Sequence, residues 1–168
     1  MISYQKIFAF LWRVKQVEET LKGVWVGQGR EEALRLRATK SKKLQAVFHL
    51  GYLLRCAMLH CINSLHSYLM VTLEGAWDRF AAETAAAPTL DDLLARHKAF
   101  QQEALEITLC TSREKNLQLS LGNLFVVISN FKVVSQKLQE SFNEYYQKLR
   151  LYEDRQSMAR RGITVESL

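Results

Sequence analysis

Turn-forming residues are scarce in this sequence, and their scarcity limits the folds that the chain can adopt. The 168 residues include one proline and seven glycines. Sandwiches, barrels and βαβ folds need a turn roughly every ten residues, and proline and glycine form many of those turns. The sequence therefore predicts a few long elements in one domain, or in a piece of a larger one. The apolar content of 48% predicts a packed core and excludes wholesale disorder.

Apolar residues recur every three or four positions along most of the chain, which is the spacing of one helix face. The stripes predict helices over residues 3–26, 41–77 or as far as 84, 89–109 and 111–152. Their expected boundary residues are Ser3, Gly27, Gly29, Ser41, Pro88, Thr89 and Thr111. We therefore expect an all-α fold, an antiparallel bundle of about four long helices over 1–152, followed by a polar tail over 153–168.

The net charge of +6 is concentrated near the start of the chain. Residues 1–43 hold ten basic and four acidic residues, whereas 44–168 hold 13 of each. A basic segment, of which 31–37 is expected to form a short helix, contributes Arg30, Arg35, Arg37, Lys40, Lys42 and Lys43 as candidate partner-binding residues. Such a segment is typical of contacts with an acidic protein, nucleic acid or an acidic membrane surface, or it is only solvated. No aromatic residues are interleaved with these charges, which disfavours single-stranded nucleic acid.

Two aromatic residues of the first helix lie off its apolar stripe. The stripe contains Ile7, Leu11 and Val14, while Phe10 and Trp12 point elsewhere. Either this helix is buried on two sides, or the two rings meet something outside the chain. Phe10 and Trp12 are therefore the remaining candidate partner-binding residues.

The sequence contains no recognisable catalytic or cofactor-binding motif. It has no phosphate-binding glycine loop, no H-E-x-x-H and no G-x-S-x-G. Cys56 and His60 share a helix face near Cys61 and His66, but their apolar neighbours favour a core role over a zinc site. Asp91 and Asp92 are explained by helix capping, and His97 by a hydrogen-bonded position at the edge of a core. We expect neither enzymatic activity nor a cofactor, metal or small-molecule substrate.

Two further features concern the surroundings of the protein. Three cysteines are too few for a disulfide framework, so a reducing compartment is expected. No apolar run reaches the roughly 18 residues that cross a bilayer, so no membrane span is expected.

Three segments, taken in order, resemble motifs of the gamma-tubulin complex protein family. The first, Tyr4–Glu18, is similar to Y-x-x-[IV]-F-x-F-L-[LW]-R-x-K-x-[VM]-E. The second, Met58–Trp77, is similar to M-x-H-F-I…Y…L-E-x-x-W, and the third, Leu90–Phe100, to L-D-x-[LI]-[IL]-x-x-H-x-x-F. The resemblance covers about residues 3–152, and the first motif most resembles the third paralogue. Glu19, Ala57 and Cys61 depart from the family pattern.

The resemblance implies a helical domain that binds gamma-tubulin, as the C-terminal part of a longer protein. It implies a non-enzymatic scaffold for microtubule nucleation at the microtubule-organising centre or spindle pole of the cytoplasm, with gamma-tubulin and other gamma-tubulin complex proteins as partners. A generic helical adaptor and a nucleic-acid-binding helical domain are the alternatives. The motif residues on apolar stripes are expected in the core, namely Tyr4, Phe8, Leu11, Met58, Trp77 and Phe100.

Overall fold

The computed structural model describes residues 2–26, 35, 39 and 41–160, and every element in these ranges is helical. The α-helices are α1 (Ile2–Val26), α3 (Lys42–Ala85), α4 (Leu90–Ile107) and α5 (Lys115–Arg160), with a 3₁₀ turn at Ser112–Glu114. The all-α prediction is confirmed. Arg30, Arg37, Lys40, the glycines Gly27 and Gly29, and the short helix expected at 31–37 (apart from the helical Arg35) lie outside the described residues.

Side-chain capping starts two of the helices as expected. The Ser41 hydroxyl accepts a hydrogen bond from the Leu44 N–H (3.4 Å), and the Thr89 hydroxyl accepts one from the Asp92 N–H (3.2 Å). These bonds satisfy N–H groups that have no partner inside the helix. Ser3, in contrast, lies inside α1, which begins at Ile2.

The turn between α4 and α5 differs from the prediction. Thr111 donates a hydrogen bond to the Glu114 carboxylate but does not cap a backbone N–H, so a 3₁₀ turn precedes α5. Leu109 lies in the left-handed region at φ 57°, and the Cys110 N–H reaches back to the Leu105 carbonyl at 2.7 Å. This arrangement is a Schellman-type helix end, in which glycine is the usual residue.

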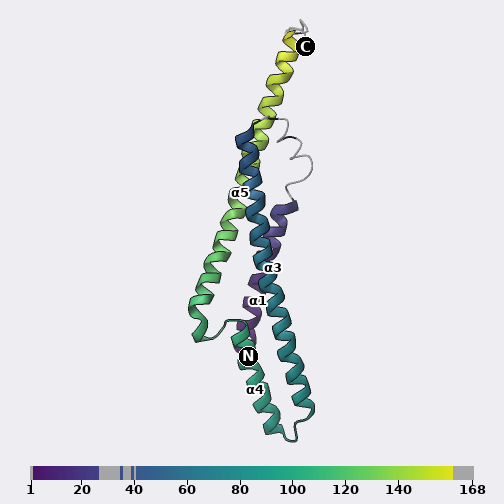
Figure 1. Cartoon of the computed structure of the whole chain (residues 1–168), viewed down its shortest axis with the longest axis vertical. Helices are drawn as coiled ribbons and strands as arrows, with labels where there is room; N and C mark the ends of the chain where they lie inside the picture. Colours follow the sequence, from purple (N-terminus) through teal and green to yellow (C-terminus); the bar gives the residue numbers. More distant parts are fainter. Residues whose placement is uncertain (1, 27–34, 36–38, 40, 161–168) are drawn as a thin grey trace.

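Helix α1 lies in the middle of the molecule. It packs against α3 and α4 and also against α5, while α3 and α4 form a hairpin. Figure 1 shows that α3 runs antiparallel to α1 and α4, whereas α5 runs in the same direction as α1 and α4. In the described residues the expected antiparallel bundle of about four long helices is therefore not confirmed, because α5 runs parallel to α1.

The core forms where α3 and α5 meet α1. Val14 and Leu21 of α1, Ile62 and Leu69 of α3 and Ile128 of α5 are fully buried. Burying each such side chain contributes about 1.5–3 kcal/mol. The α1 members of this core, Phe10, Val14, Val17 and Leu21, are three or four positions apart and share it with residues of α3 and α5.

The two long helices extend beyond this core. Helix α5 continues through the predicted polar tail as far as Arg160, and residues 151–160 are exposed. In Figure 1 this end projects past the other helices. The C-terminal part of α5 therefore lies outside the hydrophobic core.

One apolar helical stretch corrects a sequence-based expectation. Within Leu90–Arg160, an 18-residue window has a mean hydropathy of 1.4, which is sufficient by length and composition to cross a membrane. A single such window is weak evidence of a membrane span, because core helices of soluble proteins have the same composition. Phe125 and Ile128 of α5 pack in the core with α1, although only 11% of the apolar window is buried.

Candidate protein-binding surfaces

The candidate metal ligands do not form a cluster. The described residues contain no group of three or more His, Cys, Asp or Glu side chains that could hold a metal ion. Cys56 and Cys61 are free thiols, and His60 Nδ1 is hydrogen-bonded to the Ser64 hydroxyl at 3.4 Å. The structure therefore does not bring Cys56, His60, Cys61 and His66 together with a third ligand, among the residues it describes.

Two parts of the basic segment are placed by the structure. Arg35 lies against α5, where its Nη1 donates to Asn143 Oδ1 at 3.4 Å and its guanidinium lies 5.6 Å from the centre of the Tyr146 ring. Lys42 and Lys43 are exposed in the first turn of α3. Lys43 lines a pocket with Phe142 and Tyr145, so it lies close to the part of α5 that contacts Arg35.

The two candidate aromatic residues of α1 have opposite environments. Phe10 is 8% exposed and belongs to the core, so the expectation that it presents an exposed ring is wrong. The physical reason is that α1 is buried on two sides, with Phe10 in the cluster that it shares with α3 and α5. Trp12 is 54% exposed and stacks on Phe8, with ring centres 6.2 Å apart and planes 13° apart.

Three motif residues expected in the core are exposed instead, namely Tyr4, Phe8 and Trp77. Tyr4 and Trp77 join a cluster of rings at the α1–α3–α4 junction, because the Tyr4 hydroxyl and His97 Nε2 form a hydrogen bond of 2.9 Å. Trp77 meets Phe100 edge-on at 5.8 Å. The prediction of a hydrogen-bonded His97 at the edge of the core is confirmed. The expectation that Tyr4, Phe8 and Trp77 are core residues is therefore wrong.

An ionic cluster that the sequence did not reveal lies between α1 and α3. Glu18 is buried, its carboxylate is paired with Lys15 (3.0 Å) and Lys22, and His66 Nδ1 lies 3.5 Å away. The hydrogen bond from Lys22 is the main cause that lowers the pKa of Glu18 below its ordinary value of 4.5. Burial opposes the shift, and Lys15 adds to it. The i, i+3 and i, i+4 spacing on α1 is the signal that could have identified the pairs with lysine.

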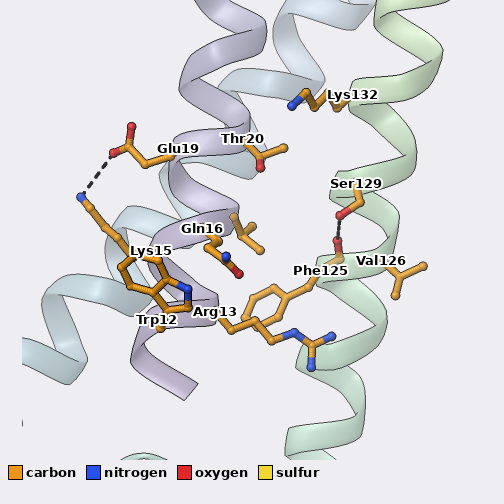
Figure 2. A pocket seen from close by; sticks show the side chains of 11 residues that line it. Trp12, Arg13, Lys15, Gln16, Glu19, Thr20, Phe125, Val126, Ser129 and Lys132 are labelled. Atoms are coloured by element: carbon orange, nitrogen blue, oxygen red, sulfur yellow. Dashed lines mark hydrogen bonds and ion pairs between the residues drawn. The ribbon is translucent and has the colours of Figure 1, made fainter. Parts of the chain in front are cut away.

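A groove between α1 and α5 is lined by apolar, basic and other polar side chains, including Gln16, Glu19, Thr20 and Ser129. It has a volume of about 710 Å³. Figure 2 shows the Phe125 ring pointing from α5 toward α1, Trp12 and Arg13 at one end and Lys132 at the other. The Arg13 guanidinium lies 5.3 Å from the centre of the Phe125 ring. Because an aromatic ring and arginine are common anchors of protein interfaces, this groove is a candidate binding surface.

The outer face of α3 is a second candidate surface, because it is long and uncharged. From Leu44 to Leu73 the only Lys, Arg, Asp or Glu is Arg55, which is buried. Exposed residues follow a 3–4 spacing along this face: Val47, Leu50, Leu54, Ala57, Cys61, Ser64, Tyr68 and Val71. Thirty helical residues span about 45 Å. An uncharged exposed face of this length is typical of a surface that another protein element covers.

The sequence matches the family model described as "Gamma tubulin complex component C-terminal" over residues 1–164. It is 31% identical over 151 residues to "Gamma-tubulin complex component 3" of Arabidopsis thaliana, covering 84% of this chain and 18% of that protein. It is 28% identical over 169 residues to "Gamma-tubulin complex component 3 homolog" of Xenopus laevis (98% and 18%). It is 27% identical over 168 residues to "Spindle pole body component alp4" of Schizosaccharomyces pombe (92% and 21%).

These comparisons confirm the resemblance found in the sequence, including its likeness to the third paralogue. The chain spans about a fifth of the length of these curated relatives. The similarity therefore concerns one portion of each relative.

Proposed function

Because the chain belongs to the gamma tubulin complex component C-terminal family, we propose that it is a scaffold part of a gamma-tubulin complex. In this role it binds gamma-tubulin and supports microtubule nucleation, without enzymatic activity, a cofactor or a small-molecule substrate. The observation that carries the proposal is the family match over residues 1–164. The family comprises structural components of gamma-tubulin complexes and is not a known enzyme family.

The proposed partners and location follow from the same relatives. The partners are gamma-tubulin and other gamma-tubulin complex proteins, and no membrane is required. The location is the cytoplasmic cytoskeleton, at a microtubule-organising centre or spindle pole, since one relative is named a spindle pole body component. In this proposal residues 1–152 form a helical bundle of about four long helices that is part of a larger gamma-tubulin-binding domain. Residues 153–168 form its polar tail.

Charge and exposure support a contact through the basic segment. Lys42 and Lys43 are exposed, and Arg35 lies nearby on the α5 side of the molecule. Arg30, Arg37 and Lys40 extend this segment in the sequence. An excess of positive charge steers an acidic partner toward its surface and speeds association. We propose that these six residues contact gamma-tubulin.

The test is charge reversal in the purified full-length protein. Changing Arg35, Arg37, Lys40, Lys42 and Lys43 to Glu is expected to weaken gamma-tubulin binding at least about tenfold at low salt, with a smaller effect at high salt. The measurement is pull-down of purified gamma-tubulin at two salt concentrations. A control variant reverses Lys98, Arg113 and Lys115, which lie on α4, the 3₁₀ turn and the start of α5. Equal binding by both variants, with intact helical content, would refute the role of the basic segment.

The same preparations separate the alternatives. A nucleic-acid-binding domain would shift labelled DNA or RNA in a gel, with an affinity that falls steeply with salt. A generic helical adaptor would bind neither nucleic acid nor gamma-tubulin. Failure of the unmodified full-length protein to bind gamma-tubulin would overturn the proposed function itself.

A further inference from the structure

The α1–α5 groove mixes apolar and polar side chains between two basic residues. Val17, Phe125 and Val126 line it beside Gln16, Thr20 and Ser129, with Arg13 and Lys132 toward its ends. The buried ring of Phe125 lies in its floor, and the half-exposed Trp12 ring stands at one end, supported by its stack on Phe8. Rigid aromatic residues bury a large apolar area while losing little side-chain entropy. The groove therefore offers an anchoring site for apolar side chains of another molecule.

Of the basic residues that line the groove, one is paired with glutamates and two are not. Lys15 pairs with Glu18 at 3.0 Å and with Glu19 at 3.4 Å. Arg13 and Lys132 form no ion pair with any described residue. Figure 2 places these two side chains at opposite ends of the groove. The electrostatic complement of this surface is thus an apolar segment with acidic residues toward both ends.

The dimensions of the groove match two turns of a helix. Its lining runs from Trp12 to Thr20 on α1 and from Phe125 to Lys132 on α5. At a rise of 1.5 Å per residue these stretches are about 12 and 10 Å long. A helix laid along the groove would present apolar residues at positions i, i+4 and i+7, the usual spacing of helices bound in grooves.

We propose that the α1–α5 groove is a docking site for an amphipathic helix of a partner protein, with acidic residues flanking its apolar stripe. The apolar stripe fills the groove between Trp12 and Phe125, and the acidic residues pair with Arg13 and Lys132. This site goes beyond the proposed function, because it uses the α1–α5 surface and does not depend on gamma-tubulin binding.

The test uses two designed helical peptides of about 20 residues, long enough to exceed the groove. Both carry the same leucine stripe; one has flanking glutamates and the other flanking lysines. Binding of the labelled peptides to the purified full-length protein is measured by fluorescence anisotropy. The glutamate peptide is expected to bind at least about tenfold more tightly than the lysine peptide, and W12A is expected to weaken it by a similar factor. Trp77→Ala is the matched control, because Trp77 is also 54% exposed but lies at the α3–α4 contact.

Charge reversal distinguishes docking from loss of folding. The double variant Arg13→Glu, Lys132→Glu is expected to lose the glutamate peptide and to gain binding of the lysine peptide, a gain that an unfolded protein cannot produce. Absence of binding by the glutamate peptide, equal binding of the two peptides, or an equal effect of the two tryptophan variants would overturn the proposal.

Discussion

The inner and outer faces of α3 have the same seven-residue repeat but opposite environments. On the inner face Arg55, Ile62, Leu69 and Ala76 are buried. On the outer face Val47, Leu54, Cys61 and Tyr68 are exposed. An apolar repeat therefore does not show by itself which face of a helix is buried. The arrangement of the neighbouring helices decides which face is buried within this chain.

The largest expected difference in the free energy of unfolding is between alanine variants of two adjacent residues, one on each face. Leu69 is fully buried and Tyr68 is 62% exposed. Leu69→Ala is expected to lower the free energy of unfolding by about 2–5 kcal/mol, because it leaves a cavity in the core. Tyr68→Ala is expected to change it by no more than about 0.5 kcal/mol. The measurement is urea unfolding of the 168-residue chain, and similar losses for both variants would mean that the outer face is also packed.

A smaller loss of stability is expected when the buried Glu18, which lies between α1 and α3, is changed. Glu18→Gln is expected to lower the free energy of unfolding by about 1 kcal/mol at neutral pH, because its charge-assisted hydrogen bonds pair it with partly exposed lysines. The pKa of Glu18 is lowered in the folded state, so its contribution is present above about pH 4.5 and is lost as the pH falls through the folded value. Urea midpoints of Glu18→Gln and the unmodified chain should therefore converge below pH 4.5.

The groups that face Glu18 are Lys15, Lys22 and His66. The control for Glu18→Gln is therefore a variant of an exposed glutamate that pairs with the same lysines. Glu19 is exposed and is bridged by the same two lysines. Glu19→Gln removes this exposed carboxylate and serves as the control. Convergence of midpoints in both variants would assign the pH effect to the lysines and not to the buried carboxylate.

The smallest effect on folding is expected on the outer face. Leu54→Lys together with Val71→Lys is expected to leave the urea midpoint almost unchanged, because both side chains are exposed. The same change should reduce self-association and dye binding of the 168-residue chain, since it interrupts a long apolar surface. Light scattering and fluorescence of an apolar dye measure these effects. Loss of the folded state would show that the two side chains are needed within the chain.

Much of the fold could be predicted because it is set by local chemistry. The helical class, the break at Pro88 and the caps at Ser41 and Thr89 depend on nearest neighbours along the chain. The direction of α5 and the burial of Phe10 could not be predicted in this way. They depend on a turn at Leu109 that uses a left-handed backbone without glycine, and on a helix that is covered from two sides.

Of the candidate surfaces, some could be identified from the sequence and one only from the structure. The basic segment and Trp12 were identified from the sequence, because charge and ring type are visible there. The α1–α5 groove was not, since Arg13 and Lys132 are 119 positions apart and line one groove only when α5 packs against α1.

By itself, the sequence determined that this chain is helical, where most of its helices begin and end, and which family it resembles, because these properties follow from local spacing and ordered motifs. Only the tertiary structure decided which apolar face is core and which is surface. The reason is that, on a helix with apolar residues on several faces, only the face that contacts neighbouring helices is buried. In α3 the neighbours α1 and α4 reach the inner face, and the outer face stays exposed.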